Sequence, residues 1–295
     1  MKINTQRLLV GGSIVAMFGL MATLPFNMGG CSAGNINIAG MVNAGGKAFK
    51  AATLDARHEK AIGESVSLAL TNDYGVTKSE QLSQYVVLVG QTVASRTSRA
   101  DQPWVFGVLD TQTVNAFSGP GGYVWVTRGA IEQMQDESEL AGVLAHEIGH
   151  VVKKHGLQAA QQAGFADAAV TAIQSNNNLN EFNGLSDKVV DIIVKQGFTQ
   201  PQEFEADAEG VKYVAAAGYD PDGLLHFLQR IRQKQQLGVP NLLSTHPGLD
   251  ERIRRISNQI SAAGTGGRGA TLRDRFNQYT GRAPQAASAQ EAGAP

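Results

Sequence analysis

The sequence predicts an α+β domain that is mostly helical and carries a small β-hairpin. Apolar residues recur at helical spacing in several segments between residues 60 and 260. Strand-forming residues dominate two short runs only, Trp104–Leu109 and Tyr123–Thr127. About two hundred ordered residues suffice for one sizeable core. We therefore expect a single folded domain over residues 50–262.

Two helices and a pair of strands form the first part of this domain. The apolar faces of the helices are marked by Ile62, Val66 and Leu70, and by Leu82, Val86, Val89 and Val93. The strand Trp104–Leu109 follows, and we expect it to be the buried partner of Tyr123–Thr127. The glycine-rich stretch 119–122 ahead of Tyr123 is a predicted turn.

The next predicted helix contains the motif H-E-x-x-H at residues 146–150. Asp136 followed by Glu139 fits a capping box, so the helix should begin near Glu137. Histidines four residues apart present both imidazoles to one ion. The carboxylate of Glu147 can then take a proton from a water molecule at the metal, as in a zinc peptidase. The alternative is a core helix with two satisfied histidines and a solvated glutamate.

Spacing excludes one class of zinc peptidase. A metzincin needs glycine at position 153 and histidine at position 156, where this chain has Lys153 and Gly156. His155 lies about 140° around the helix from His150. We therefore expect His155 to be an exposed residue of the last turn, where a cation suits the helix dipole. Gly149 weakens the helix locally and lets another backbone or a substrate come close.

A later helix offers four acids, which a helical wheel divides into two pairs. Glu205 and Glu209 share a charged face with Lys212, whereas Glu203 and Asp207 lie on the opposite, largely apolar side. A carboxylate on such a face is costly to bury without a strong partner. We predict that Glu203 is the third metal ligand and that Asp207 accepts a hydrogen bond from a ligating histidine. The alternative is that all four acids are solvated.

Together these motifs resemble the gluzincin metallopeptidases that include the HtpX heat-shock protease and the CAAX prenyl proteases (metallopeptidase family forty-eight). The likeness rests on H-E-x-x-H followed by E-x-E-A-D, on residues 115–129 upstream, and on Ser244-Thr245-His246-Pro247 with Arg252-Ile253 downstream. It covers most of residues 55–260 and is greatest with the soluble, lipid-anchored bacterial branch. The resemblance implies a zincin-like fold and one zinc ion per chain. In that family the positions of His146, His150 and Glu203 bind zinc, Glu147 is the general base, and Asp207 is the supporting aspartate.

Two further residues are candidates for the same site. His246 precedes Pro247, so its backbone is biased away from helix and a loop is expected. His246 could stabilise the tetrahedral oxyanion, or act as a fourth zinc ligand that blocks the water position and keeps the enzyme latent. A third possibility is a histidine bonded to backbone in a tight turn. Arg252 is a second candidate for the oxyanion region.

The stretch Gly122, Tyr123, Val124 and Trp125 precedes the H-E-x-x-H helix and is a candidate substrate-binding strand. An extended peptide could add to its edge through backbone hydrogen bonds, largely independently of side-chain sequence. The residues alone fit a core hairpin equally well, and the family resemblance favours the substrate-binding edge.

The N-terminus has the pattern of a secretory signal. Lys2 and Arg7 precede an apolar run from residue 8 to 24, and Met28-Gly29-Gly30-Cys31 resembles a bacterial lipoprotein box. We predict a lipoprotein signal peptide over residues 1–30 and a lipid on Cys31, the only cysteine. Ser32 resembles the outer-membrane sorting signal. The alternative is an uncleaved signal anchor, and both interpretations place the domain outside the cytoplasmic membrane.

The remaining segments complete the predicted order. Residues 31–49 read as a flexible tether and residues 263–295 as a low-complexity tail with a possible short helix near residues 272–279. An Ala- and Gln-rich helix at 156–172 and a short apolar helix at 189–194 separate the predicted ligands and could cover the cleft. Two more helices have their apolar faces at Leu224, Leu225, Leu228 and Ile231, and at Leu249, Ile253, Ile256 and Ile260.

Composition limits the partners. The net charge is −1 at pH 7 and no long basic run occurs, which argues against nucleic acid. The glycine-rich segments lack the Lys-Ser/Thr of a phosphate loop, so no nucleotide is expected. The resemblance implies a zinc endopeptidase on the periplasmic side of the bacterial envelope that acts on unfolded or misassembled envelope polypeptides. The alternative is an outer-membrane assembly or chaperone-like factor with latent proteolysis.

Overall fold

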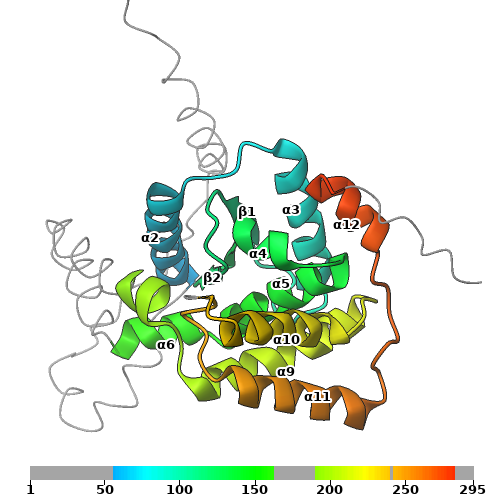
Figure 1. Ribbon diagram of the computed structural model, residues 1–295. Coiled ribbons are helices and arrows are strands. Elements are labelled where there is room, and N and C mark those ends of the chain that lie inside the picture. The colour runs from blue at the N-terminus through cyan, green and yellow to red at the C-terminus, as the bar shows by residue number, and fades with distance from the viewer. Residues whose placement is uncertain (1–55, 163–189, 240–241, 283–295) are drawn as a thin grey trace, which may run out of the picture. The chain divides into compact units, whose positions relative to one another are not determined.

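The computed structural model describes residues 56–162, 190–239 and 242–282 (Figure 1). Its elements, in chain order, are α2 (Ala56–Tyr74), α3 (Glu80–Ala94), β1 (Val105–Leu109), β2 (Ala116–Gly119), β3 (Tyr123–Thr127), α4 (Arg128–Gln133), α5 (Glu137–Val152), α6 (His155–Gln162), the π-helix η4 (Ile192–Gln196), α9 (Gln200–Ala216), α10 (Asp222–Gln236), α11 (Leu249–Ala263) and α12 (Arg273–Thr280). Helices greatly outnumber strands in these segments, which confirms the predicted α+β class.

The three strands form a mixed sheet in the order β1-β3-β2. The strand β1 pairs with β3 as predicted, but the two run parallel, whereas β2 pairs with β3 antiparallel. The hairpin partner is therefore β2, which the sequence did not predict. Its residues are Ala, Phe, Ser and Gly, and only phenylalanine among them is a strong strand former.

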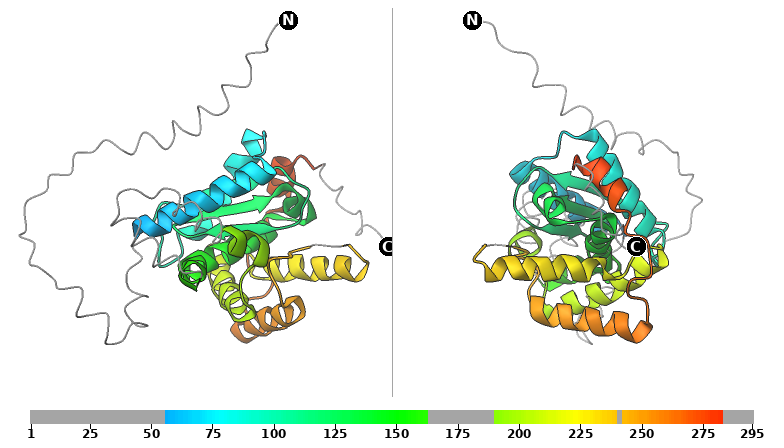
Figure 2. Two further views of the ribbon diagram at one scale, coloured as in Figure 1. Left: turned by 90° about the vertical axis from the view of Figure 1, so that its left-hand side faces the viewer. Right: turned by 45° about the vertical axis from the view of Figure 1, so that its right-hand side comes forward.

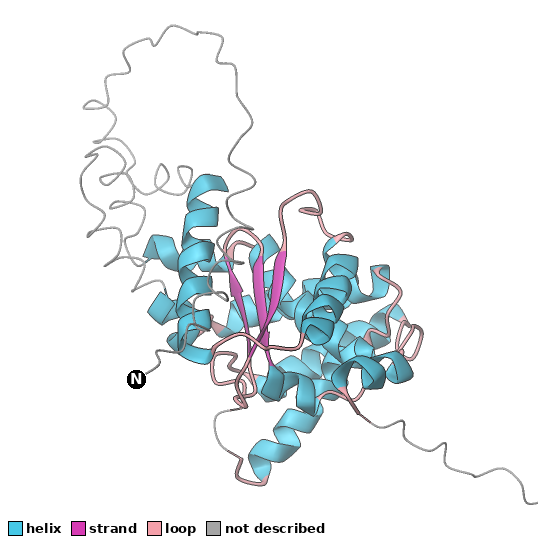
Figure 3. Cartoon of the chain, turned by 90° about the horizontal axis from the view of Figure 1, so that it is seen from above, coloured by secondary structure: helices cyan, strands magenta, loops and turns pink. Residues whose placement is uncertain are grey.

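Helices cover both faces of this sheet (Figures 2 and 3). Val124 and Val126 of β3 belong to the larger core, which α3, α5 and α10 also line. Trp125 and Phe117 point to the opposite face and pack with apolar residues of α2. This alternation follows from the two-residue period of a strand. It leaves β3 buried on both faces, with α5 directly against the sheet.

Helix α5 is the centre of the domain, because every residue from Glu137 to Val151 is buried. The Asp136 carboxylate accepts a hydrogen bond from the Glu139 backbone N–H, which confirms the predicted helix start. The helix packs against α9, α10 and α3. A Cβ atom on Gly149 would lie 2.8 Å from the carbonyl oxygen of Ala206 in α9. Glycine at this position therefore allows the close approach of α5 and α9, and these two helices carry the predicted ligands.

Helix α12 packs against the domain beyond residue 262, where the domain was predicted to end. Phe276 is fully buried, and the Arg275 guanidinium donates to the Glu137 carboxylate at the start of α5. The same carboxylate accepts hydrogen bonds from Tyr85 (2.8 Å) and Tyr219 (2.6 Å). The short helix near residues 272–279 was anticipated, but its packing was not, because one buried phenylalanine in a polar segment gives little periodic signal. The folded domain thus extends to residue 282.

Several predictions fall outside the described residues. These are the signal peptide, Cys31, the tether, the greater part of the segment between α6 and η4, and the tail from residue 283. Within the described ranges, no helix combines the length and the apolar content needed to cross a bilayer.

Candidate metal centre

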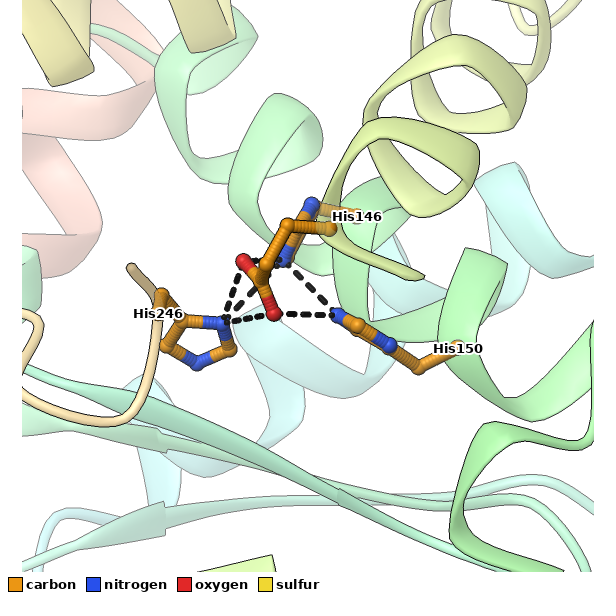
Figure 4. Close-up of side chains that lie close together, drawn as sticks. His146, His150 and His246 are labelled. Carbon is orange, nitrogen blue, oxygen red and sulfur yellow. Dashed lines mark hydrogen bonds and ion pairs between the residues drawn. The ribbon is translucent and has the colours of Figure 1, made fainter. Parts of the chain in front are cut away.

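Four buried side chains converge on one point between α5, α9 and the loop before α11 (Figure 4). His146 and His150 come from α5, Glu203 from α9 and His246 from the loop, and their ligand atoms lie within 4.8 Å of one another. The His146 and His150 Nε2 atoms are 3.1 Å apart, and Glu203 Oε1 lies 3.3 Å from His150 Nε2. Imidazole nitrogens and a carboxylate are the donors that zinc prefers in proteins.

The outer hydrogen bonds of two rings aim one nitrogen of each ring at this point. His146 Nδ1 lies 2.8 Å from Asp207 Oδ1, so Nδ1 keeps its proton and Nε2 is the nitrogen that faces the cluster. His246 Nε2 lies 3.2 Å from the carbonyl oxygen of Ala116, which can only accept. His246 Nδ1 faces Glu203 Oε2 at 3.1 Å, so a metal ion bound at Nδ1 would take the place of a proton. The cluster therefore fits a metal ion in donor type and in orientation.

Electrostatics keep the carboxylates of the site charged. Burial alone would lower the pKa of His146, but hydrogen bonding and charge from Asp207 and Glu203 outweigh burial and raise that pKa to about 9. Burial would raise the pKa of Asp207, yet the Arg252 charge and the His146 hydrogen bond hold it at about 2. Burial lowers the pKa of His150 well below its usual value. His150 is thus neutral at physiological pH, whereas His146 would release its Nε2 proton when a metal ion binds.

Glu147 lies beside the cluster and is almost completely buried. Its Oε1 atom is 3.4 Å from His246 Nε2, and its Oε2 atom has no hydrogen-bond partner. A buried carboxylate oxygen without a partner is costly unless another molecule completes its bonding. The geometry suits a base that accepts a proton from a water molecule or a substrate at the cluster.

Arg252 of α11 lies behind the four converging side chains and contacts Glu203 and Asp207. Its Nε and Nη2 atoms donate to the two oxygens of Asp207 at 2.8 and 2.7 Å, and Nη1 lies 2.8 Å from Glu203 Oε2. Arg252 is therefore hydrogen-bonded to Asp207 through two nitrogens and forms an ion pair with Glu203 through the third. This arrangement favours a positioning role for Arg252 over the oxyanion role that the sequence also allowed.

The prediction that His155 is exposed is wrong. The side chain is almost fully buried, and its Nδ1 atom lies 2.8 Å from His150 Nδ1. Helix α5 ends at Val152, and Lys154 adopts a positive φ of 60° that redirects the chain before α6. The helical wheel assumed a continuous helix and therefore placed His155 on the wrong side. A histidine just beyond the motif was the only sequence signal for this contact.

The prediction of a substrate-binding edge at Gly122, Tyr123, Val124 and Trp125 is also wrong. Residues 123–125 lie in β3, whose two edges are occupied by β1 and β2. A further strand cannot add to a central strand. The strand β2 is the edge of the sheet on the side of the cluster, because its Ala116 carbonyl contacts His246. The parallel pairing of β1 with the other side of β3 could not be predicted from turn spacing alone.

Comparison with known proteins identifies the family. A model described as Peptidase family M48 matches residues 80–260, which is more than half of the chain. The chain belongs to peptidase family M48. The beta-barrel assembly-enhancing protease of Yersinia pestis is 28% identical over 222 residues, covering 71% of this chain and 45% of that protein. The corresponding protein of Escherichia coli (strain K12) is 26% identical over 220 residues, with the same coverage.

A third relative, also a metalloprotease, matches over more of its length. Metalloprotease LoiP of Escherichia coli (strain K12) is 26% identical over 243 residues, covering 80% of this chain and 92% of LoiP. The chain therefore spans less than half the length of the assembly-enhancing proteases and most of the length of LoiP. M48 peptidases are zinc-dependent metallopeptidases, so the family and the zinc cofactor predicted from the sequence are both confirmed.

Proposed function

We propose that this M48 peptidase is a zinc endopeptidase of the bacterial envelope that cleaves unfolded or misassembled envelope proteins. The supporting observation is the buried convergence of His146, His150 and Glu203 beside the carboxylate of Glu147. Zinc at this cluster would act as a Lewis acid that polarises the scissile carbonyl and makes water a better nucleophile. The names of the two assembly-enhancing proteases refer to β-barrel assembly, and we extend that association to this chain.

In the proposed reaction Glu147 is the general base. It accepts the proton of the attacking water and passes it to the leaving amine, which requires an oxygen free of other partners. Asp207 holds the His146 ring in the tautomer that exposes Nε2. Arg252 balances the charge of Asp207 and Glu203, so both carboxylates stay ionised in a buried site.

The free edge of β2 is the proposed binding site for the substrate backbone. Phe117, between Ala116 and Ser118, pairs through its backbone with β3. The backbone N–H and C=O groups of Ala116 and Ser118 therefore point away from β3, toward the free edge of the sheet. The Ser118 hydroxyl is buried without a partner, and the Ala116 carbonyl is held by His246. An extended peptide that paired with this edge would compete with His246 for the same carbonyl. Pairing through backbone groups suits substrates that share no sequence.

We propose that His246 is a fourth ligand that keeps the site latent. Its Nδ1 atom faces the cluster, and its ring also contacts Glu147. The backbone N–H of Leu243 donates to the carbonyl of Val114, and Asn115 donates to Thr245, so the loop is fastened beside β2. In this state the ligands and the base are all buried. Release of the loop would expose the metal, the base and the strand edge together.

Replacing His246 with alanine is expected to raise the rate of casein hydrolysis, because the substitution frees a metal position and the Glu147 carboxylate. The initial rate at equal zinc content is the measurement. His226→Ala is the matched control, since His226 is exposed on α10. A fall in the rate of the His246 variant would favour the transition-state role, and an unchanged rate would leave the structural role alone.

We further propose that the domain is tethered on the periplasmic side of the outer membrane by a lipid on Cys31. The basic, apolar and small-residue order of residues 1–30 supports export and lipidation. Ser32 after the cysteine supports the outer membrane over the inner one. Substrates would then be met where β-barrel proteins are assembled.

The proposed activity is tested by incubating the full chain with casein, an unfolded substrate, and with a stably folded protein as control. We expect cleavage of casein that stops with a chelator and returns when zinc is added. The unsubstituted protein is compared with the His246→Ala variant, so that latency is not mistaken for inactivity. Cleavage that continues after the chelator has removed all zinc would refute the metal-dependent mechanism.

A further inference from the structure

We propose that His155 is a positioning residue that holds the zinc ligand His150 in a single tautomer and orientation. This inference rests on the proposed role of His150 at the zinc site. The two Nδ1 atoms are 2.8 Å apart, and both rings are almost completely buried. His155 thus contacts the outer nitrogen of His150, as Asp207 contacts the outer nitrogen of His146. The difference is that the partner of His150 is an imidazole and not a carboxylate.

The direction of the hydrogen bond follows from the number of protons. Only one proton fits between two nitrogens 2.8 Å apart. His150 Nε2 faces the cluster, 3.1 Å from His146 Nε2, and must offer a lone pair when it binds metal. The proton of His150 therefore resides on Nδ1 and is donated to His155 Nδ1. The remaining proton of His155 is on Nε2, which lies 3.4 Å from Glu205 Oε2.

The surroundings keep this arrangement in place. The Phe198 ring stacks on His150 with centroids 4.2 Å apart and an interplanar angle of 20°. The same ring lies 5.9 Å from the His155 ring. Burial of both histidines shields this hydrogen bond from bulk water. Without His155, the His150 N–H would be a buried donor that loses its acceptor, which is unfavourable.

The backbone before His155 supports a specific placement. Lys154 has a φ of 60°, in the left-handed region that non-glycine residues rarely adopt. This turn ends the run of α5 and begins α6 at His155. Backbone strain of this kind persists where the surrounding structure requires it. Here the turn at Lys154 brings the His155 ring within hydrogen-bond distance of His150.

The two histidine ligands are therefore supported unequally. Asp207 is a buried carboxylate that is also bound by Arg252, so the support of His146 is rigid and charged. His155 is a ring whose outer partner, Glu205, has a side chain that is 59% exposed. Water can replace Glu205 at that contact, so the link from His150 to His155 should matter far more than the link from His155 to Glu205.

Three substitutions at one position separate these links in the full chain. The amide oxygen of asparagine stands near the position of Nδ1, so His155→Asn keeps an acceptor for His150. The longer glutamine places its amide near the position of Nε2, so His155→Gln keeps the Glu205 contact and loses the His150 contact. His155→Phe keeps a ring and loses both. Glu205→Gln is the control for the outer contact.

Zinc affinity, measured by competition with a chromophoric chelator, is the main readout. We expect His155→Gln and His155→Phe to weaken zinc binding by about 10–100-fold, the usual effect of losing an outer hydrogen bond of a ligand. His155→Asn and Glu205→Gln should stay close to the unsubstituted protein. The visible spectrum of the cobalt(II)-loaded protein should shift for glutamine and phenylalanine and not for asparagine, which a simple loss of packing would not produce.

Equal zinc affinity for the unsubstituted, glutamine and phenylalanine forms would overturn the proposal. Equal loss for asparagine and glutamine would also overturn it, because the acceptor would then be irrelevant. If the phenylalanine form does not fold, the asparagine and glutamine pair decides the question. Failure of the unsubstituted protein to bind zinc would instead refute the proposed function on which the inference rests.

Discussion

Glu147→Gln is expected to lower the rate of peptide hydrolysis by about 10²–10⁴-fold, the contribution typical of a general base. Glutamine has the same shape but cannot accept a proton and return it to the leaving amine. Zinc binding should be unchanged, because Glu147 is not among the four converging ligands. The initial rate of casein hydrolysis and the zinc content of the purified variant are the two measurements.

Glu80→Gln is a suitable control for that experiment, since Glu80 is an exposed acid at the start of α3 and distant from the site in sequence. Full hydrolytic activity of the Glu147 variant would contradict the proposed base. The same variant also separates protease from assembly factor. If it restores growth or envelope assembly to a strain that lacks the gene, binding alone accounts for the physiological role.

The helix that carries H-E-x-x-H could be predicted because its determinants are local. Asp136 and Glu139 mark its start, and the apolar period of the helix marks its buried face. The separation of Glu203 from Glu205 was predictable for the same reason. Both residues lie on one uninterrupted helix, and the structure buries Glu203 and exposes Glu205 as the helical wheel indicates.

The features that the sequence did not reveal depend on contacts between distant segments. The edge position of β2 depends on the parallel pairing of β1 with β3, which no turn signal specifies. The burial of His155 depends on the left-handed turn at Lys154, and a lysine does not predict a positive φ. The Ala116 carbonyl that orients His246 is a backbone group, so no residue type could have marked it.

Arg252→Met is expected to destabilise the protein by roughly 3–5 kcal/mol, the typical cost of removing one partner of a buried ion pair. Methionine fills much of the volume of the arginine stem but leaves Asp207 and Glu203 without their shared cation. The free energy of unfolding in urea is the measurement. We expect the larger loss in the chelator-treated protein, because zinc would otherwise supply part of the missing positive charge.

Arg255→Met tests whether the effect belongs to the buried site or to helix α11. Arg255 lies three residues further along the same helix, is more than half exposed and pairs with Glu251. An exposed pair of this kind contributes little to stability, so its loss should be small. Similar losses for the two variants would contradict the argument, since they would place the stabilisation in the arginine stems. A loss of stability confined to Arg252→Met, and reduced by zinc, would show that Arg252 and the metal ion both stabilise the fold by offsetting the negative charge of Glu203 and Asp207.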